Sequence, residues 1–353
     1  MRKKRILVAA LNWGLGHATR CIPIIKELQL NDFEPLIASD GSALELLKKE
    51  FPHLDHIELP SYNIQYTKKG SHLKWKMIMD SPRILKAIQE EKMITRKIVE
   101  NYNIQGIISD NRFGVRSKRL KTNVFITHQL NVLSGNTSFL SSYLHQQYIS
   151  KFDQCWVPDV AGENNLSGIL GHLKKKPENV KYIGPLSRLE KSNTPEFYDF
   201  LVLLSGPEPQ RSILESILLK EFKTSEARVL FIRGVISEEK LNFENPNINI
   251  KNYLYGKALQ VAINSSKYIV SRSGYTTLMD LAKLEKKAFF IPTPGQEEQE
   301  YLAKRLQELG IAPYSKQDEF NLGQLRRIED YDGLRDFGDH VIFRDLFSFF
   351  ERE

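Results

Sequence analysis

The amino-acid sequence has few cysteines and no long apolar run. Its 353 residues include two cysteines, Cys21 and Cys155, too few for a disulfide framework or a cysteine zinc cluster. Apolar runs such as Ile6–Leu11 fall far short of the roughly 18–20 residues that a membrane-spanning helix needs. The basic start Met1–Arg5 precedes an apolar stretch that ends at Asn12, which is not the pattern of a signal peptide. These absences favour a soluble, cytoplasmic protein whose cysteines are inert, buried thiols.

The composition is that of a globular chain with excess positive charge. Hydrophobic residues make up 41% and charged residues 26%, which excludes wholesale disorder and collagen-like repeats. The net charge of +7 fits an anionic partner (nucleic acid, a phosphorylated small molecule or an acidic membrane surface) or serves solubility alone. Lysines and arginines cluster in segments 68–76 and 112–121 without any known nucleic-acid-binding pattern. We therefore expect no nucleic acid among the partners.

Short apolar runs alternate with segments of helical periodicity along most of the chain. Helices are predicted after the first strand, at Ala43–Glu50 and at Arg83–Asn101. This alternation is typical of a parallel sheet with crossover helices, so we predict an α/β fold. The predicted strands are Ile6–Ala10, Pro35–Ser39, Gly106–Ser109, Val124–Thr127, Gln154–Val157, Lys181–Pro185, Phe200–Leu204, Val229–Ile232, Tyr268–Val270 and Ala288–Ile291.

The strand–helix pattern restarts after a polar, linker-like segment, 188–194. At roughly 100–200 residues per domain, the length also suggests two domains. We predict a Rossmann-like N-terminal domain over 1–187 and a Rossmann-like C-terminal domain over 188–353. Phenylalanines at four- and three-residue spacing predict a last helix at about 338–351, which could pack back on the N-terminal domain.

A glycine-containing turn follows the first predicted strand. Gly14 and Gly16 would let the backbone approach an anion at the start of a helix, and His17 would point at the bound group. The same glycines form an imperfect dinucleotide fingerprint, with Asp40 at the place of a ribose-binding acid. An NAD-dependent oxidoreductase is therefore an alternative, as is a turn without any ligand.

A second strand–turn–helix signal lies in the other half of the chain. Ser273 is expected to cap the helix after the strand Tyr268–Val270, and Gly274 would let a phosphate approach it. Asp280 falls about two turns into that helix, where a carboxylate could meet a ribose diol. The turn Ile291–Glu300 is rich in amide and carboxylate groups, which suit the recognition of hydroxyls.

These motifs occur in an order that resembles the GT-B glycosyltransferases related to the peptidoglycan UDP-GlcNAc transferase (glycosyltransferase family 28-like). The matching segments are Gly14–His17, Ser205–Pro207, Arg272–Gly274 with Asp280, and Pro292–Glu300. The resemblance spans roughly residues 5 to 310. It implies two Rossmann-like domains facing a cleft, with the acceptor bound mainly by the first and the nucleotide sugar by the second. It implies no metal and no other cofactor.

The resemblance also assigns site residues. His17 is the first candidate for the catalytic base and Asp110 the second, since Gln129 replaces the glutamate of the family and cannot act as a base. Arg112, His128 and Asn131 are expected on the acceptor side. Asp280 stands where the family has a ribose-binding glutamate. Glu300 stands where the family has a glutamine that reads the donor sugar, so the identity of that sugar is not carried over. The expected donor-binding residues are Gly14, Gly16, Arg188, Ser205, Gly206, Leu254, Ser273, Gly274, Thr276, Thr277, Asp280, Gln299 and Glu300.

We therefore predict an inverting, metal-independent glycosyltransferase that moves a sugar from a UDP-sugar to a hydroxyl, with a lipid-linked or cell-envelope glycan as a candidate acceptor. A nucleotide-sugar 2-epimerase, the NAD-dependent oxidoreductase and a non-catalytic sugar-nucleotide-binding protein are the alternatives. Trp75, Met77 and Ile78, interleaved with lysines, suggest peripheral contact with an anionic membrane, at its inner face, or an apolar segment packed inward.

Overall fold

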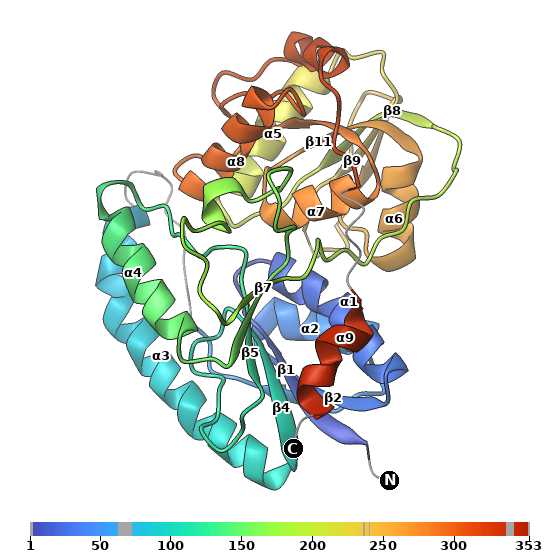
Figure 1. The fold of residues 1–353 in the computed structure, drawn as a ribbon. Coiled ribbons are helices and arrows are strands. Elements are labelled where there is room, and N and C mark those ends of the chain that lie inside the picture. The colour runs from blue at the N-terminus through green and yellow to red at the C-terminus, as the bar shows by residue number, and fades with distance from the viewer. Residues whose placement is uncertain (1–2, 63–72, 236, 240, 337–341, 352–353) are drawn as a thin grey trace. The chain divides into compact units, whose positions relative to one another are not determined.

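A computed structural model describes residues 3–62, 73–235, 237–239, 241–336 and 342–351 (Figure 1). The side chains of 73–82, which include the predicted interfacial segment, and of Asn136 lie outside this description. The described chain divides into two compact units. The N-terminal unit holds the residues up to 62, Lys74–Arg188 and the chain from residue 342, and the C-terminal unit holds Leu189–Asp336.

The N-terminal unit is built on a seven-stranded parallel sheet in the order β3-β2-β1-β4-β5-β6-β7. The interior strand β1 contains the apolar run Ile6–Ala10, whose residues are all fully buried because both faces of a parallel sheet are covered. The strands are β1 (Lys4–Ala10), β2 (Phe33–Ser39), β3 (His56–Glu58), β4 (Ile104–Asp110), β5 (Asn123–Ile126), β6 (Gln154–Val157) and β7 (Val180–Tyr182).

Helices cover both faces of this sheet. They are α1 (Gly16–Leu30), α2 (Gly41–Glu50), α3 (Leu73–Asn101), α4 (Ser138–Ile149) and α9 (Phe343–Phe347), with short 3-10 turns at Gly135–Thr137, Gly168–Leu170 and Ser348–Glu351. On one face, Ile98 of α3 packs in a cluster with Leu7 of β1. On the other, Phe347 of α9 packs against Phe33, and Phe350 packs against Trp156. The last segment therefore completes the core of the N-terminal unit.

The C-terminal unit has a five-stranded parallel sheet in the order β10-β9-β8-β11-β12. Its core is a continuous apolar cluster between the sheet, α5 and the 3-10 segment near the end of the unit. The elements are β8 (Tyr198–Leu203), α5 (Gln210–Phe222), β9 (Val229–Ile232), β10 (Ile248–Lys251), α6 (Gly256–Asn264), β11 (Ser266–Ser271), α7 (Tyr275–Lys283), β12 (Lys287–Phe290), α8 (Glu297–Glu308) and the 3-10 segment Leu322–Asp330.

The predicted α/β class is confirmed, and each predicted strand corresponds to an observed one. The prediction missed β3, β10 and α4. β10 is an edge strand in which Asn249 and Lys251 alternate with isoleucines, so it lacks the continuous apolar run of a central strand. Residues 338–341 of the predicted last helix lie outside the described residues, and its described part consists of α9 followed by a 3-10 turn from Ser348.

The strand order of both sheets reverses at one point. In the N-terminal unit the reversal lies between β1 and β4, and in the C-terminal unit between β8 and β11. In open parallel sheets, ligands bind in the crevice beyond the carboxyl ends of the strands at such a switch point. The topology therefore directs attention to the loops after these four strands.

Candidate active site

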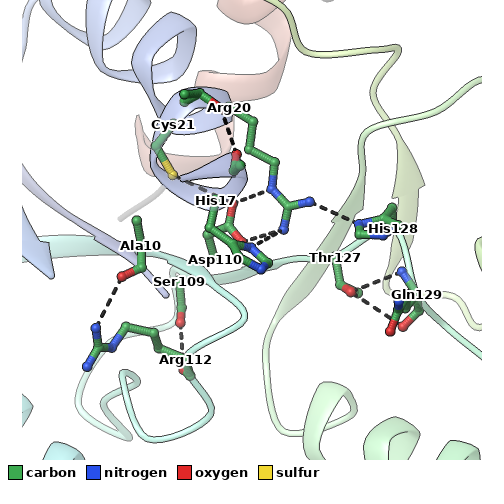
Figure 2. A network of polar contacts seen from close by, with 12 residues as sticks. Ala10, His17, Arg20, Cys21, Ser109, Asp110, Arg112, Thr127, His128 and Gln129 are labelled. Atoms are coloured by element: carbon green, nitrogen blue, oxygen red, sulfur yellow. Dashed lines mark hydrogen bonds and ion pairs between the residues drawn. The ribbon is translucent and has the colours of Figure 1, made fainter. Parts of the chain in front are cut away.

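The switch point of the N-terminal unit holds a paired histidine and aspartate. His17 lies in the first turn of α1, after a loop in which Gly14 adopts a φ of +77° that favours glycine. Asp110 is the last residue of β4, the strand next to β1. The Nδ1 atom of His17 lies 2.7 Å from Oδ1 of Asp110 (Figure 2). The structure therefore brings together the two residues predicted as candidate bases.

Sequence reasoning missed Arg20, which occupies the centre of this cluster. Arg20 is 1% exposed, and its Nε and Nη2 atoms both donate to the carboxylate of Asp110. It lies three residues after His17 and so on the same face of α1, a spacing that could have identified it. Cys21 also contacts Asp110, with its Sγ atom 3.7 Å from Oδ2.

The contacts define the protonation of His17. Since a carboxylate oxygen only accepts, Nδ1 of His17 donates its proton to Asp110, and the neutral ring presents an unprotonated Nε2. The side chain is 14% exposed, and no described residue bonds Nε2. His17 therefore has the form that a general base needs, held by a carboxylate on its other nitrogen.

The charges of the cluster agree with this assignment. Burial lowers the pKa of His17, and nearby Arg20 lowers it further, against the opposing effect of Asp110. Burial alone would raise the pKa of Asp110, but Arg20 and His17 bring it down to about 2. Asp110 is thus a buried, ionised partner that orients His17, and His17 is the better candidate for the base.

The predicted acceptor-side residues occupy different environments. His128, in the loop after β5, is 7% exposed, and its Nδ1 accepts a hydrogen bond from Nη1 of Arg20 at 3.0 Å (Figure 2). Asn131 uses its side-chain amide to donate to the backbone oxygen of Ile169 at 2.6 Å. His128 therefore belongs to the His17 cluster, whereas the Asn131 amide fixes a neighbouring loop.

Arg112 does not lie open on the acceptor side, contrary to the prediction. It is fully buried and pairs with Asp40 (2.7 Å) and Glu91 (2.6 Å). It also donates to the backbone oxygens of Ala10 and Pro60, so it ties the ends of β1 and β2 to α3. The same contacts occupy the Asp40 carboxylate, which the oxidoreductase alternative requires for a ribose.

The switch point of the C-terminal unit has the features of an anion site. Ser205 and Gly206 follow β8 and are exposed, and Gly206 has a φ of +103°. α7 begins at Tyr275 after Gly274, a cap residue that has no side chain to bond the first N–H groups of the helix. A Cβ atom added at Gly206 or at Gly274 would have no heavy atom closer than 4.0 Å. These loops therefore leave room for a group that accepts hydrogen bonds from a helix N-terminus.

The neighbouring loop after β12 is fixed by the two residues expected to recognise the sugar. Oε1 of Gln299 accepts from the backbone N–H of Thr293 at 2.9 Å, and Oε1 of Glu300 accepts from that of Gly295 at 2.8 Å. Ser273 was predicted as a helix cap, but its hydroxyl donates to the backbone oxygen of Gln299 at 2.7 Å. The cap position belongs to Gly274, because Gly274 still has an extended backbone and the helix begins only after it.

Arg272 is a buried cation beneath these loops. It is 1% exposed and donates to the backbone oxygens of Gln210, Ile291 and Pro292 and to Oε1 of Gln317. Burial lowers the pKa of Arg272 to about 9. Its Nε atom and the hydroxyl of Thr293 have no hydrogen-bond partner among the described residues. Positive charge and unused polar groups thus gather at this switch point.

The remaining predicted donor residues belong to both units. Thr276, Thr277 and Asp280 are half-buried on α7, and Leu254 lies in the loop after β10. Arg188 belongs to the N-terminal unit, where its Nη1 donates to Oε1 of Glu50 at 3.0 Å.

Within the described chain, no group of three His, Cys, Asp or Glu side chains could hold a metal ion. In the same residues, no helix is long and apolar enough to cross a membrane.

Comparison with known proteins agrees with the geometry. Residues 200–328 match the C-terminal domain of glycosyltransferase family 28. The chain is 21% identical over 339 residues to the UDP-N-acetylglucosamine–N-acetylmuramyl-(pentapeptide) pyrophosphoryl-undecaprenol N-acetylglucosamine transferase of Haemophilus ducreyi, with 92% of this chain and 88% of that protein covered. It is 20% identical over 300 residues to an uncharacterised glycosyltransferase of Methanopyrus kandleri, with 81% and 85% covered.

Solved structures share the fold. MurG of Acinetobacter baumannii superposes with a TM-score of 0.59 at 14% identity, covering 99% of this chain and 100% of that one. The glycosyltransferase of kitacinnamycin gives a TM-score of 0.66 at 13% identity, covering 93% and 89%. The chain is a GT-B glycosyltransferase with a C-terminal domain of the family 28 type, which confirms the resemblance carried by its motifs.

Proposed function

We propose that the chain moves a sugar from a nucleotide diphosphate donor, with UDP as the nucleotide, to a hydroxyl acceptor with inversion at the anomeric carbon. The observation that carries this proposal is the His17–Asp110 pair, 2.7 Å apart at a topological switch point. A neutral imidazole held by a buried carboxylate is the arrangement that removes a proton from a hydroxyl nucleophile.

In the proposed reaction, Nε2 of His17 takes the proton of the acceptor hydroxyl. The acceptor oxygen then forms a bond to the anomeric carbon of the donor sugar, while the bond from that carbon to the diphosphate oxygen breaks and its electron pair leaves with the nucleotide. Asp110 stabilises the imidazolium that forms, since its carboxylate already accepts the Nδ1 proton. A single displacement of this kind inverts the anomeric carbon.

The C-terminal unit is the proposed donor site. The N–H groups at the start of α7, together with the loop at Ser205 and Gly206, would bind the diphosphate, and the helix dipole favours its negative charge. Arg272 adds a buried positive charge. These groups can stabilise the departing diphosphate without a metal ion, which supports a metal-independent reaction. Asp280, Thr276, Thr277 and Leu254 remain proposed contacts to the nucleoside and phosphates.

A lipid-linked acceptor is the favoured class. One face of α4 in the N-terminal unit carries apolar side chains that are more than half exposed, and a contiguous apolar patch of this kind marks a lipid or protein contact. The H. ducreyi relative is named for an undecaprenol-linked acceptor. These observations also support peripheral contact with the inner face of a membrane. The residues are Phe139, Leu140, Tyr143 and Leu144.

The first test is thermal shift with UDP, dTDP, GDP, ADP and NAD(H), with and without EDTA. A ligand that binds only the folded state stabilises it by about 2.7 kcal/mol at a hundredfold excess over Kd. We expect UDP to raise the Tm in the presence of EDTA. A shift with NAD(H) alone would refute the donor site.

The second test measures UDP release from UDP-sugars with lipid-linked and free glycan acceptors. His17→Gln should lower kcat/KM by about 10²- to 10⁴-fold and leave UDP binding unchanged, because the base acts on the acceptor hydroxyl. His53→Gln is the matched control, since His53 is an exposed histidine of the same unit. UDP binding with no transfer and interconversion of the donor sugar instead would establish the epimerase alternative.

A further inference from the structure

Arg20 contacts three polar side chains that come from three different parts of the N-terminal unit. Its Nε and Nη2 donate to Asp110 at the end of β4, and its Nη1 lies 3.0 Å from Nδ1 of His128 in the loop after β5. Its Nη2 also lies 3.0 Å from Nδ1 of His17 in α1 itself. With 1% exposure, this guanidinium has no access to a ligand of its own.

The contacts of Asp110 and Arg20 assign the role of Nδ1 in each of the two histidine rings. A guanidinium has five N–H donors and no acceptor, so Nδ1 of His128 accepts from it and the His128 proton lies on Nε2. Nδ1 of His17 faces a carboxylate at 2.7 Å and therefore donates, which leaves the Nη2 contact with His17 a close approach of two donors. The two histidines thus carry their protons on opposite ring nitrogens.

We propose that Arg20 is a positioning residue that fixes these opposite tautomers and keeps His17 a neutral base at physiological pH. The assignment of His17 as the base rests on the proposed function, but the tautomers do not. A lysine at this position would retain the charge and lose the planar fork that reaches Asp110 and His128 together. The network therefore requires arginine, and not only a cation.

The groups facing His17 determine the sign of the effect. Asp110 on β4 favours the protonated ring, whereas Arg20 on α1 and His128 after β5 disfavour it, and burial disfavours it most. Cys21 contacts Asp110, and burial raises the pKa of its thiol, so it stays uncharged. Loss of the Arg20 charge leaves Asp110 as the dominant neighbour, so the His17 pKa should rise.

The test compares Arg20→Gln and Arg20→Lys with Lys26→Gln, which removes an exposed charge from the same helix. Imidazole ¹⁵N NMR reports the tautomers, with the His17 signals assigned by His17→Gln. In Arg20→Gln we expect a mixture of tautomers at His128 and an acid limb of kcat/KM that moves to higher pH by about 1 unit or more. At a pH below both acid limbs this shift should lower kcat/KM about tenfold, with recovery at higher pH.

Arg20→Lys keeps the proposal testable if Arg20→Gln does not fold. It should hold the acid limb near that of the wild type while losing the single tautomer of His128. Wild-type tautomers and a wild-type acid limb in either folded variant would overturn the role of Arg20. If the wild type transfers no sugar, the proposed function fails, and the NMR measurement still decides whether Arg20 fixes the two rings.

Discussion

His145 makes the stability of the N-terminal unit depend on pH. The ring lies edge-on to Phe113, with centroids 5.4 Å apart, and near Phe125 at 6.1 Å. Its Nε2 atom is buried without a hydrogen-bond partner among the described residues. Burial lowers the pKa of His145 from 6.5 to about 4. Between these two pH values His145 is therefore neutral in the folded protein and protonated in the unfolded chain.

The size and sign of this effect follow from the shift. Between the two pKa values the unfolded chain binds more protons, so the contribution of His145 to the free energy of unfolding is full above pH 6.5 and declines as the pH falls toward 4. A displacement of about 2.5 pKa units corresponds to roughly 3 kcal/mol, at about 1.4 kcal/mol per unit. His145→Phe removes the titrating group and retains an aromatic ring, so we expect it to abolish this decline.

Urea unfolding between pH 7.5 and 4 would measure the effect. All three tryptophans, Trp13, Trp75 and Trp156, belong to the N-terminal unit, so their fluorescence reports on the unfolding of that unit. Other groups titrate in the same range, and the difference between wild type and variant isolates His145. We expect the stability of His145→Phe relative to wild type to increase by about 3 kcal/mol on acidification. A difference that does not change with pH would refute the reasoning, and His53→Gln should show none.

Two further substitutions test other assignments. Arg112→Met leaves Asp40 and Glu91 as buried carboxylates without their cation. It should therefore lower the free energy of unfolding of the N-terminal unit in urea by about 3–5 kcal/mol. An unchanged free energy of unfolding with a raised KM for the acceptor would instead assign Arg112 to the acceptor site. Thr293→Val removes a buried hydroxyl that has no hydrogen-bond partner among the described residues, so the Tm of the protein without ligand should stay equal or rise. A lower Tm would show that this hydroxyl is hydrogen-bonded.

The sequence predicted the elements that have a strong local signal. Continuous apolar runs such as Ile6–Ala10 and Val229–Ile232 became buried strands, because a strand covered on both faces has no polar positions. β10 was not predicted as a strand, because Asn249 and Lys251 give its sequence the polar character of a loop. Strand order was not available from periodicity, because it depends on contacts between segments far apart in the chain.

The candidate site was predictable only in part for a similar reason. The loops after β1, β4, β8 and β11 contain glycines and polar residues that mark them in the sequence. Whether a polar side chain in such a loop faces a ligand or the protein depends on its tertiary partners. Asp110 and Arg112 are two residues apart, yet one contacts His17 and the other ties α3 to the sheet. No pattern within one segment distinguishes these roles.

The two units share a strand order and differ in how their buried charges are balanced. In the N-terminal unit, Arg20 pairs with Asp110, and Arg112 pairs with two acids, so both buried arginines have carboxylate partners. In the C-terminal unit, the partners of Arg272 among the described residues are carbonyl and amide oxygens, and none is a carboxylate. Burial and the nearby Arg20 disfavour a charge on His17, whereas an uncompensated cation such as Arg272 favours an anionic ligand. The balance of charge therefore supports proton transfer on the first unit and diphosphate binding on the second.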